Sequence, residues 1–293
     1  MEKNRSILLI YTGGTIGMVN DPVSGALVPI DFRHVSAQVP ELRRFGFNIE
    51  SMTFDPVIDS SDVSPDTWCS IANTIKGNYA RYEGFVVLHG TDTMSYSASA
   101  LSFMLQGLEK PVIFTGSQLP IGVLRTDGKE NLLTAIEIAA ALEDGLPVVP
   151  EVCIFFENRL FRGNRTVKYS AEHFNAFVSP NLPPLAEAGL QIRYNRSIIR
   201  YPTIRRPLEV YCNIETAVAV LRLFPGIGRA TVHALLAQAG LKGIILETYG
   251  TGNAPMSGWF LEELRSFISG GGIVLNVTQC QAGSVEMGLY ETS

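Results

Sequence analysis

Residues 7–17 read ILLIYTGGTIG, and this stretch decides the fold. Five apolar residues, 7–11, predict a short buried strand, after which the chain turns at Gly13 and Gly14. Two consecutive glycines allow a sharp turn and the close approach of a small ligand to the main chain. The turn follows the carboxyl end of the strand, where open α/β sheets bind their ligands. Thr15 therefore stands where chemistry is possible, although an ordinary strand-to-helix turn explains the same residues.

Two further apolar runs also end in polar residues. The segment GFVVL at 84–88 leads into HGTDT, which contains Thr91 and Asp92, and PVIFT at 111–115 leads into a turn that contains Ser117. Helical patterns follow these turns, and this alternation of strand and helix is typical of a parallel sheet. Since parallel strands end at one edge of a sheet, we expect the three polar turns to lie together.

Two more segments belong to the expected site. Ser60 and Ser61 lie between a predicted strand and a predicted helix, and they are either turn formers or hydrogen-bond donors to an anion. The basic loop at 159–168, RLFRGNRTVK, is mostly a solvated surface. Its Lys168 is different if it lies near the site, because a desolvated lysine can act as a base toward a threonine hydroxyl.

Composition excludes several classes of protein and site. A net charge of −5 argues against a nucleic-acid footprint, and neither a phosphate-loop nor a dinucleotide motif follows the first strand. The histidines and cysteines show no metal-ligand spacing, so we expect no metal and no cofactor. The four cysteines are expected to be reduced, and too few apolar residues follow the charged start for a signal peptide, which predicts a cytoplasmic protein.

The chain is expected to form two α/β domains. The first, at 1–185, contains a mostly parallel sheet with helices on both faces and carries the catalytic residues. A segment rich in proline and arginine, at 186–207, is the expected linker. The second domain, at 208–293, is smaller and also alternates strands and helices.

The polar residues of the turns suit attack on a carbonyl or amide. Thr15 and Thr91, with Asp92 and Lys168, offer nucleophiles and acid–base groups, and the amides of the glycine turn could stabilise an oxyanion. An aspartate suits a ligand ammonium group and serine hydroxyls suit a carboxylate. These residues permit, but do not compel, an amino-acid amide as the substrate.

The motifs TGGTIG, HGTDT, GSQLP and RGNRTVK resemble the bacterial-type L-asparaginase family, specifically its cytoplasmic type I branch. This resemblance extends from about residue 6 to the end of the chain. It implies a large N-terminal α/β domain, a smaller flavodoxin-like C-terminal domain, and cofactor-free hydrolysis of L-asparagine to L-aspartate and ammonia. It also implies that Thr15 is the primary nucleophile. Thr91, Asp92 and Lys168 then form a second, triad-like group that either activates water or assists the nucleophile.

The resemblance also assigns the groups that bind substrate. Ser60 and Ser61 form the binding pair, with Ser60 on the α-carboxylate, while Asp92 takes the α-ammonium group. The carbonyl of Ser117 lies near the amide. Asn253 matches a residue lent by a neighbouring subunit, which implies a homodimer or homotetramer.

Two departures from the family pattern stand out. The family's lid tyrosine is replaced by Ala26, so either another residue takes its role, with Tyr11 and Tyr290 as candidates, or the base lies elsewhere. The family continues through further helices beyond the position of Ser293, and a missing helical layer is expected to leave an apolar sheet face bare. Two alternatives to the asparaginase hypothesis stay open. They are an amidohydrolase that prefers glutamine or a related amide, and a non-catalytic protein that binds or senses amino acids.

Overall fold

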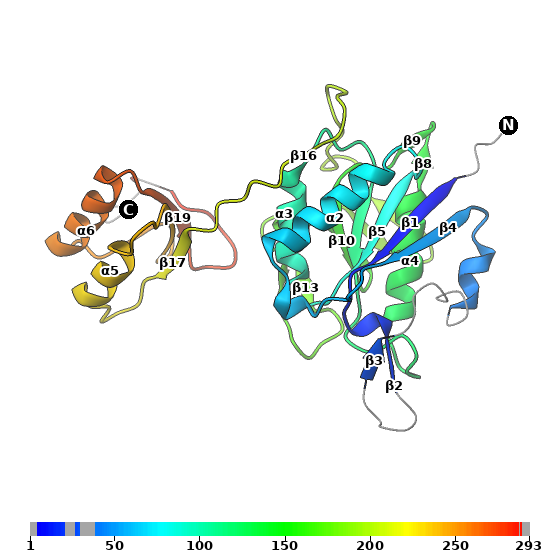
Figure 1. The fold of residues 1–293 in the computed structure, drawn as a ribbon, viewed down its shortest axis with the longest axis horizontal. Helices are drawn as coiled ribbons and strands as arrows, with labels where there is room; N and C mark the ends of the chain where they lie inside the picture. Colours follow the sequence, from blue (N-terminus) through cyan, green and yellow to red (C-terminus); the bar gives the residue numbers. More distant parts are fainter. Residues whose placement is uncertain (1–4, 21–26, 30–38, 287, 289–293) are drawn as a thin grey trace. The chain divides into compact units, whose positions relative to one another are not determined.

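The structure is a computed structural model that describes residues 5–20, 27–29, 39–286 and 288. It divides into two compact units, Met1–Cys212 and Asn213–Ser293 (Figure 1). Within the described residues, no helix is long and apolar enough to cross a membrane. The α/β fold class is confirmed, and the two units are described separately below.

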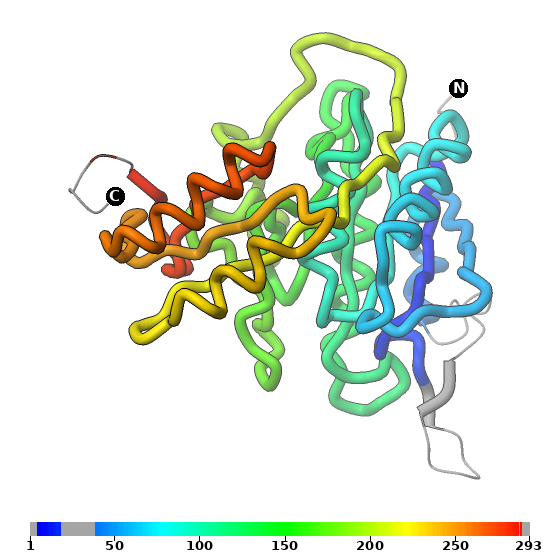
Figure 2. Tube along the Cα trace, turned by 60° about the vertical axis from the view of Figure 1, so that its left-hand side comes forward, coloured from blue at the N-terminus to red at the C-terminus, as the bar shows by residue number. Residues whose placement is uncertain are grey.

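An eight-stranded sheet forms the centre of the first unit, in the order β15-β14-β11-β10-β7-β5-β1-β4. The five strands from β4 to β10 are parallel, and β11, β14 and β15 are added antiparallel. β1 and β5 run side by side in both views (Figure 1 and Figure 2). The strands are β1 (Ser6–Tyr11), β4 (Asn48–Thr53), β5 (Gly84–Leu88), β7 (Val112–Thr115), β10 (Val152–Phe156), β11 (Arg159–Arg162), β14 (Ala186–Ala188) and β15 (Ile192–Tyr194).

The order of the parallel strands creates a switch point between β1 and β5. The chain passes from β1 to β4 on one side, and then returns to add β5, β7 and β10 on the other side. Ligands of open α/β sheets bind at such a point, outside the carboxyl ends of the strands. The turns that contain Thr15 and Thr91 follow these two strands, as the sequence predicts.

Helices cover this sheet because each has one apolar face. Ile7 and Leu9 of β1 share one buried cluster with Leu132 and Ile136 of α4. The start of α2 is fixed by a capping box at Ser64, followed by a proline at the first helical position. The helical elements are α2 (Pro65–Asn78), α3 (Met94–Met104), α4 (Gly128–Ala140), η1 (Thr15–Gly17), η3 (Pro40–Arg44), η4 (Ser60–Asp62) and η5 (Gly163–Arg165).

The first unit also contains short antiparallel strand pairs that are separate from the large sheet. They are β2 (Met18–Asn20) with β3 (Leu27–Pro29), β6 (Leu105–Gln106) with β16 (Glu209–Val210), β8 (Leu142–Glu143) with β9 (Leu146–Pro147), and β12 (Val167–Lys168) with β13 (Phe177–Val178). The pair of β12 and β13 matters for the site, because it holds the backbone of Lys168 against Phe177.

The predicted linker at 186–207 is wrong in its first part. β14 and β15 form a hairpin that extends the large sheet to Tyr194, and the compact unit runs to Cys212. These strands have three residues each, and their alternation, AEA and IRY, is too short to distinguish a strand from a loop in the sequence.

The expectation of four reduced cysteines is wrong for two of them. Cys69 of α2 and Cys212 form a disulfide, with their Cα atoms 5.3 Å apart. The pairing of β16 with β6 brings the chain back beside α2, which places Cys212 there. Cys153 is buried and Cys280 is exposed, and both are free thiols.

The second unit contains a three-stranded parallel sheet in the order β17-β18-β19. A buried cluster that includes Leu221, Ile244 and Phe260 joins the sheet to its two helices. Four apolar side chains of the edge strands are exposed in the described structure: Val218, Val220, Ile273 and Leu275. The elements are β17 (Val218–Arg222), α5 (Arg229–Leu236), β18 (Gly243–Thr248), α6 (Gly258–Ser269) and β19 (Ile273–Thr278).

Candidate active site

The turns after β1 and β5 are packed backbone against backbone. A Cβ atom added to Gly14 would lie 2.5 Å from the amide nitrogen of Gly90. Thr12 strengthens this junction, because its hydroxyl and its amide both donate to the carbonyl of Leu88, at 2.9 and 3.0 Å. The turn that carries Thr15 and the turn that carries Thr91 are therefore held side by side.

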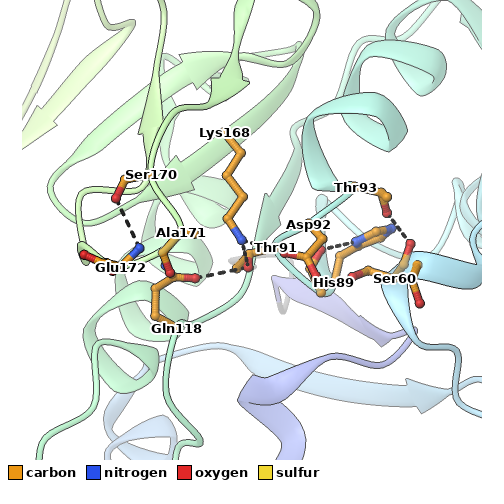
Figure 3. Close-up of polar contacts among 12 residues, drawn as sticks. Ser60, His89, Thr91, Asp92, Thr93, Gln118, Lys168, Ser170, Ala171 and Glu172 are labelled. Atoms are coloured by element: carbon orange, nitrogen blue, oxygen red, sulfur yellow. Dashed lines mark hydrogen bonds and ion pairs between the residues drawn. The ribbon is translucent and has the colours of Figure 1, made fainter.

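A lysine joins the second of these turns from a distant part of the chain. Lys168 Nζ lies 2.9 Å from Thr91 Oγ1 and 2.7 Å from Asp92 Oδ1 (Figure 3). Only 17% of the Lys168 side chain is exposed, whereas the Asp92 side chain is 70% exposed. The lysine is thus largely desolvated between a hydroxyl and a carboxylate, while the carboxylate stays open to a ligand. This arrangement can move a proton to or from Thr91.

Gln118 is a further partner of Thr91. The Thr91 hydroxyl donates to Gln118 Oε1 at 3.1 Å, and Gln118 Nε2 lies 3.3 Å from the carbonyl of Ala171 and 3.2 Å from that of His173. Gln118 lies in the turn predicted after residues 111–115, but the sequence indicates no role for its side chain. A glutamine in such a turn is ordinarily a surface residue, so its presence in the sequence is only a weak indication of a site residue.

A buried chain of hydrogen bonds fixes the backbone just before Thr91. Trp68 Nε1 donates to Ser97 Oγ at 2.9 Å, Ser97 Oγ lies 2.9 Å from His89 Nε2, and His89 Nδ1 lies 2.8 Å from the carbonyl of Gly90. Burial lowers the pKa of His89, which keeps the ring neutral. A neutral ring with its proton on Nδ1 satisfies every contact, because Nδ1 then donates to Gly90 and Nε2 accepts from Ser97.

The serine pair lies next to the same junction. Ser60 is buried, and its carbonyl accepts a 2.6 Å hydrogen bond from the hydroxyl of Thr93. A Cβ atom on Gly90 would lie 2.6 Å from Ser60 Oγ, so the Ser60 hydroxyl faces the Gly90 turn. Ser61 is exposed, and its hydroxyl and amide both donate to Asp59, which lowers the pKa of that carboxyl.

The other predicted residues differ in how they are placed. Thr15 opens η1, and within the described part of the chain its hydroxyl has no hydrogen-bond partner. Ser117 is buried and its hydroxyl donates to the carbonyl of Leu119. Asn253 belongs to the second unit, where its backbone pairs with Tyr249.

The candidates for the lid residue are only partly described. Ala26 and Tyr290 lie outside the described residues. Tyr11 is buried, its hydroxyl lies 3.3 Å from the carbonyl of Gly14, and burial raises its pKa to about 12. A phenol with so high a pKa is a poor base near neutral pH.

Comparison with known protein families identifies two family models that match this chain. Residues 6–200 match the family model described as asparaginase, N-terminal, and residues 217–293 match the glutaminase/asparaginase C-terminal domain. The chain belongs to the asparaginase family. The matched residues include every predicted site position described above, from Thr15 to Asn253.

Individual relatives agree with the family assignment. L-asparaginase 1 of Escherichia coli strain K12 is 47% identical over 300 residues, which cover all of this chain and 84% of that protein. The 60 kDa lysophospholipase of Mus musculus is 44% identical over 310 residues, and this chain spans 53% of its length. The crystal structure of L-asparaginase I from Vibrio cholerae superposes with a TM-score of 0.88 at 42% identity, covering 98% of this chain and 84% of that one.

Proposed function

We propose that this asparaginase-family chain hydrolyses L-asparagine to L-aspartate and ammonia through threonine chemistry. The observation that carries the proposal is the position of Lys168 Nζ between Thr91 Oγ1 and Asp92 Oδ1, beside the turn that presents Thr15. A relative that is 47% identical is named L-asparaginase 1, which supports asparagine as the substrate.

In the proposed mechanism, the Thr15 hydroxyl attacks the side-chain amide carbon of the substrate and its proton passes to the amide nitrogen, so that the C–N bond breaks and ammonia leaves an ester between Thr15 and the aspartyl group. Water then cleaves this ester, which releases L-aspartate and restores the Thr15 hydroxyl. Amides of the Gly13–Gly14 turn are available to stabilise the oxyanion that forms. Lys168, once it has released its own proton, takes the proton of Thr91, so that Thr91 either activates water or assists the nucleophile. The exposed Asp92 carboxylate receives the substrate ammonium group, and the Ser60 hydroxyl donates to the substrate carboxylate.

The test is ammonia release from L-asparagine by the purified protein. We expect Thr91→Val to lower kcat by on the order of 10²–10⁴-fold, because it removes the hydroxyl while keeping the shape of the side chain. Thr166→Val is the matched control, since the Thr166 hydroxyl donates to the carbonyl of Arg162 rather than to a site residue. Thr15→Ala is expected to abolish turnover. Full activity of the Thr15 variant would refute the mechanism.

Two measurements separate this proposal from the alternatives. The ratio of kcat/KM for asparagine and glutamine decides which amide is preferred. Calorimetric binding of aspartate without ammonia release from either amide would identify a binding protein.

We also propose that a homo-oligomer completes the site by contributing Asn253 from a neighbouring subunit. Light scattering measures the oligomeric state. An inactive Thr15→Ala chain is then mixed with an Asn253→Ala chain. We expect activity to return only if each site takes Thr15 from one subunit and Asn253 from its neighbour, because a mixed oligomer then contains sites with both residues intact.

A further inference from the structure

Gln118 controls the direction of the Thr91 hydroxyl. Its Nε2 lies near two backbone carbonyls, of Ala171 and His173, and an amide nitrogen can only donate to such groups. The Oε1 atom must therefore face Thr91, and it can only accept the hydroxyl proton. Lys168 Nζ donates to a lone pair of Thr91 Oγ1. While Lys168 is protonated, Gln118 therefore accepts the hydroxyl proton of Thr91 and keeps Thr91 Oγ1 in hydrogen-bond contact with Lys168 Nζ, which is the contact across which a neutral Lys168 takes that proton.

Asp127 holds the backbone on which Gln118 stands. Its Oδ1 accepts from the amides of Gln118 and Leu119 at 3.1 and 3.2 Å, and its Oδ2 accepts from the Gln118 amide at 3.0 Å. Asn131 Nδ2 donates to Asp127 Oδ2 at 3.3 Å and to the carbonyl of Gly116 at 3.0 Å. The turn after β7 is therefore tied to the first turn of α4 on both sides of Ser117.

Capping of helix α4 does not explain why the Asp127 carboxylate is buried at this position. Asp127 occupies the N-cap position of α4, but its side chain makes no capping hydrogen bond to the helix. Only 7% of the residue is exposed, and burial raises its pKa. A buried carboxylate is costly unless its hydrogen bonds compensate, and most of those bonds go to the amides of Gln118 and Leu119.

We propose that Asp127 is a positioning residue for the reaction: it fixes the turn that carries Gln118, and Gln118 in turn orients the hydroxyl of Thr91. This inference rests on the proposed function for its kinetic consequence, while the link from Asp127 to Gln118 and Thr91 is structural. Among the described residues, neither Ser60 nor Asp92 is hydrogen-bonded to Asp127 or Gln118, so the expected effect falls mainly on kcat.

Kinetics of three variants test the proposal. We expect Asp127→Ala and Gln118→Met each to lower kcat by on the order of 100-fold with KM nearly unchanged, since small misplacements near the reacting group cost this much. Asp127→Asn keeps an acceptor at Oδ1 for the amides of Gln118 and Leu119, but its NH2 group replaces Oδ2 and faces donors at Gln118 N and Asn131 Nδ2. Its loss of kcat is therefore expected to be smaller than that of the alanine variant.

A double variant tests whether Asp127 acts through Gln118. If it does, combining Asp127→Ala with Gln118→Met costs little more than the worse single change, whereas independent effects would multiply. Glu263→Gln is the matched control for loss of a buried carboxylate, because Glu263 lies in α6 of the second unit. Multiplying effects, or a rise in KM with unchanged kcat, would overturn the proposal.

Crystal structures of Asp127→Ala and Asp127→Asn provide a readout that does not depend on turnover. We expect the hydrogen bond between Gln118 Oε1 and Thr91 Oγ1 to be lost in the alanine variant and kept in the asparagine variant. Retention of this bond in the alanine variant would disprove the positioning link. If the wild-type protein releases no ammonia, the proposed function fails, and the crystal structures still decide the link.

Discussion

Replacing Gly14 by alanine is expected to damage both stability and activity. Gly14 has φ 94° and ψ 168°, a backbone conformation that is essentially restricted to glycine and costs a side chain about 1–3 kcal/mol. The added methyl group would also lie 2.5 Å from the nitrogen and 2.6 Å from the Cα of Gly90. These are backbone atoms that cannot rotate away, so overpacking adds about 1–3 kcal/mol. The total approaches half of the stability of an ordinary domain, about 5–15 kcal/mol.

The clash between a methyl group on Gly14 and the Gly90 backbone is also expected to alter the active site. Gly90 directly precedes Thr91, so a displacement of the Gly90 backbone moves the Thr91 hydroxyl relative to Lys168. A shift of about 1 Å is enough to lower kcat on the order of 100-fold. The variant is therefore expected to lose activity at temperatures where it is still folded.

Each unit contains one tryptophan, which allows the first unit to be followed by itself. Urea unfolding in a Trp259→Phe background reports on Trp68 of α2. Gly46→Ala is the matched control, because a Cβ atom there meets nothing within 4 Å. The reasoning is refuted if the Gly14 variant has the same unfolding midpoint and the same kcat as the Gly46 variant.

Two further predictions concern buried charge. Glu151→Ala is expected to cost the first unit about 3–5 kcal/mol in urea unfolding, because it leaves Arg162 buried without its bidentate partner. A cost below about 1 kcal/mol would contradict this view of the pair. In the second unit, the hydrogen bond from His233, and then that from Arg229, lowers the pKa of Glu263 below its ordinary value. A lowered folded-state pKa stabilises the unit above the ordinary glutamate pKa, and this stability is lost as pH falls through the folded-state value. Thermal unfolding of the second unit between pH 6 and about pH 3 should show this loss, and Glu263→Gln should reduce it.

The sequence predicts the parallel part of the fold because buried strands and polar turns alternate at regular positions. The runs at 7–11, 84–88 and 111–115 become β1, β5 and β7, and their order brings the polar turns to one edge.

Contacts between distant residues could not be predicted in the same way. Nothing in the spacing of residues indicates that Gln118 accepts a hydrogen bond from Thr91, or that Asp127 holds its backbone, since side-chain hydrogen bonds carry no sequence period. The pairing of cysteines has the same limitation, because connectivity does not follow from their positions in the sequence. From the residues alone, Lys168 is one possible site residue among the charges of a basic loop, and the family resemblance is what groups it with Thr91 and Asp92. Its catalytic role stays a prediction.

The bond between Cys69 and Cys212 makes the larger part of the first unit a covalent ring. The two cysteines are 143 positions apart, so a protease that cuts one peptide bond between them opens the ring without releasing a fragment. Gel analysis without a reductant would therefore report such a nicked chain as intact. The ring also closes at Cys212, one residue before the second unit begins at Asn213, so the last residue of the first unit is covalently fixed to α2.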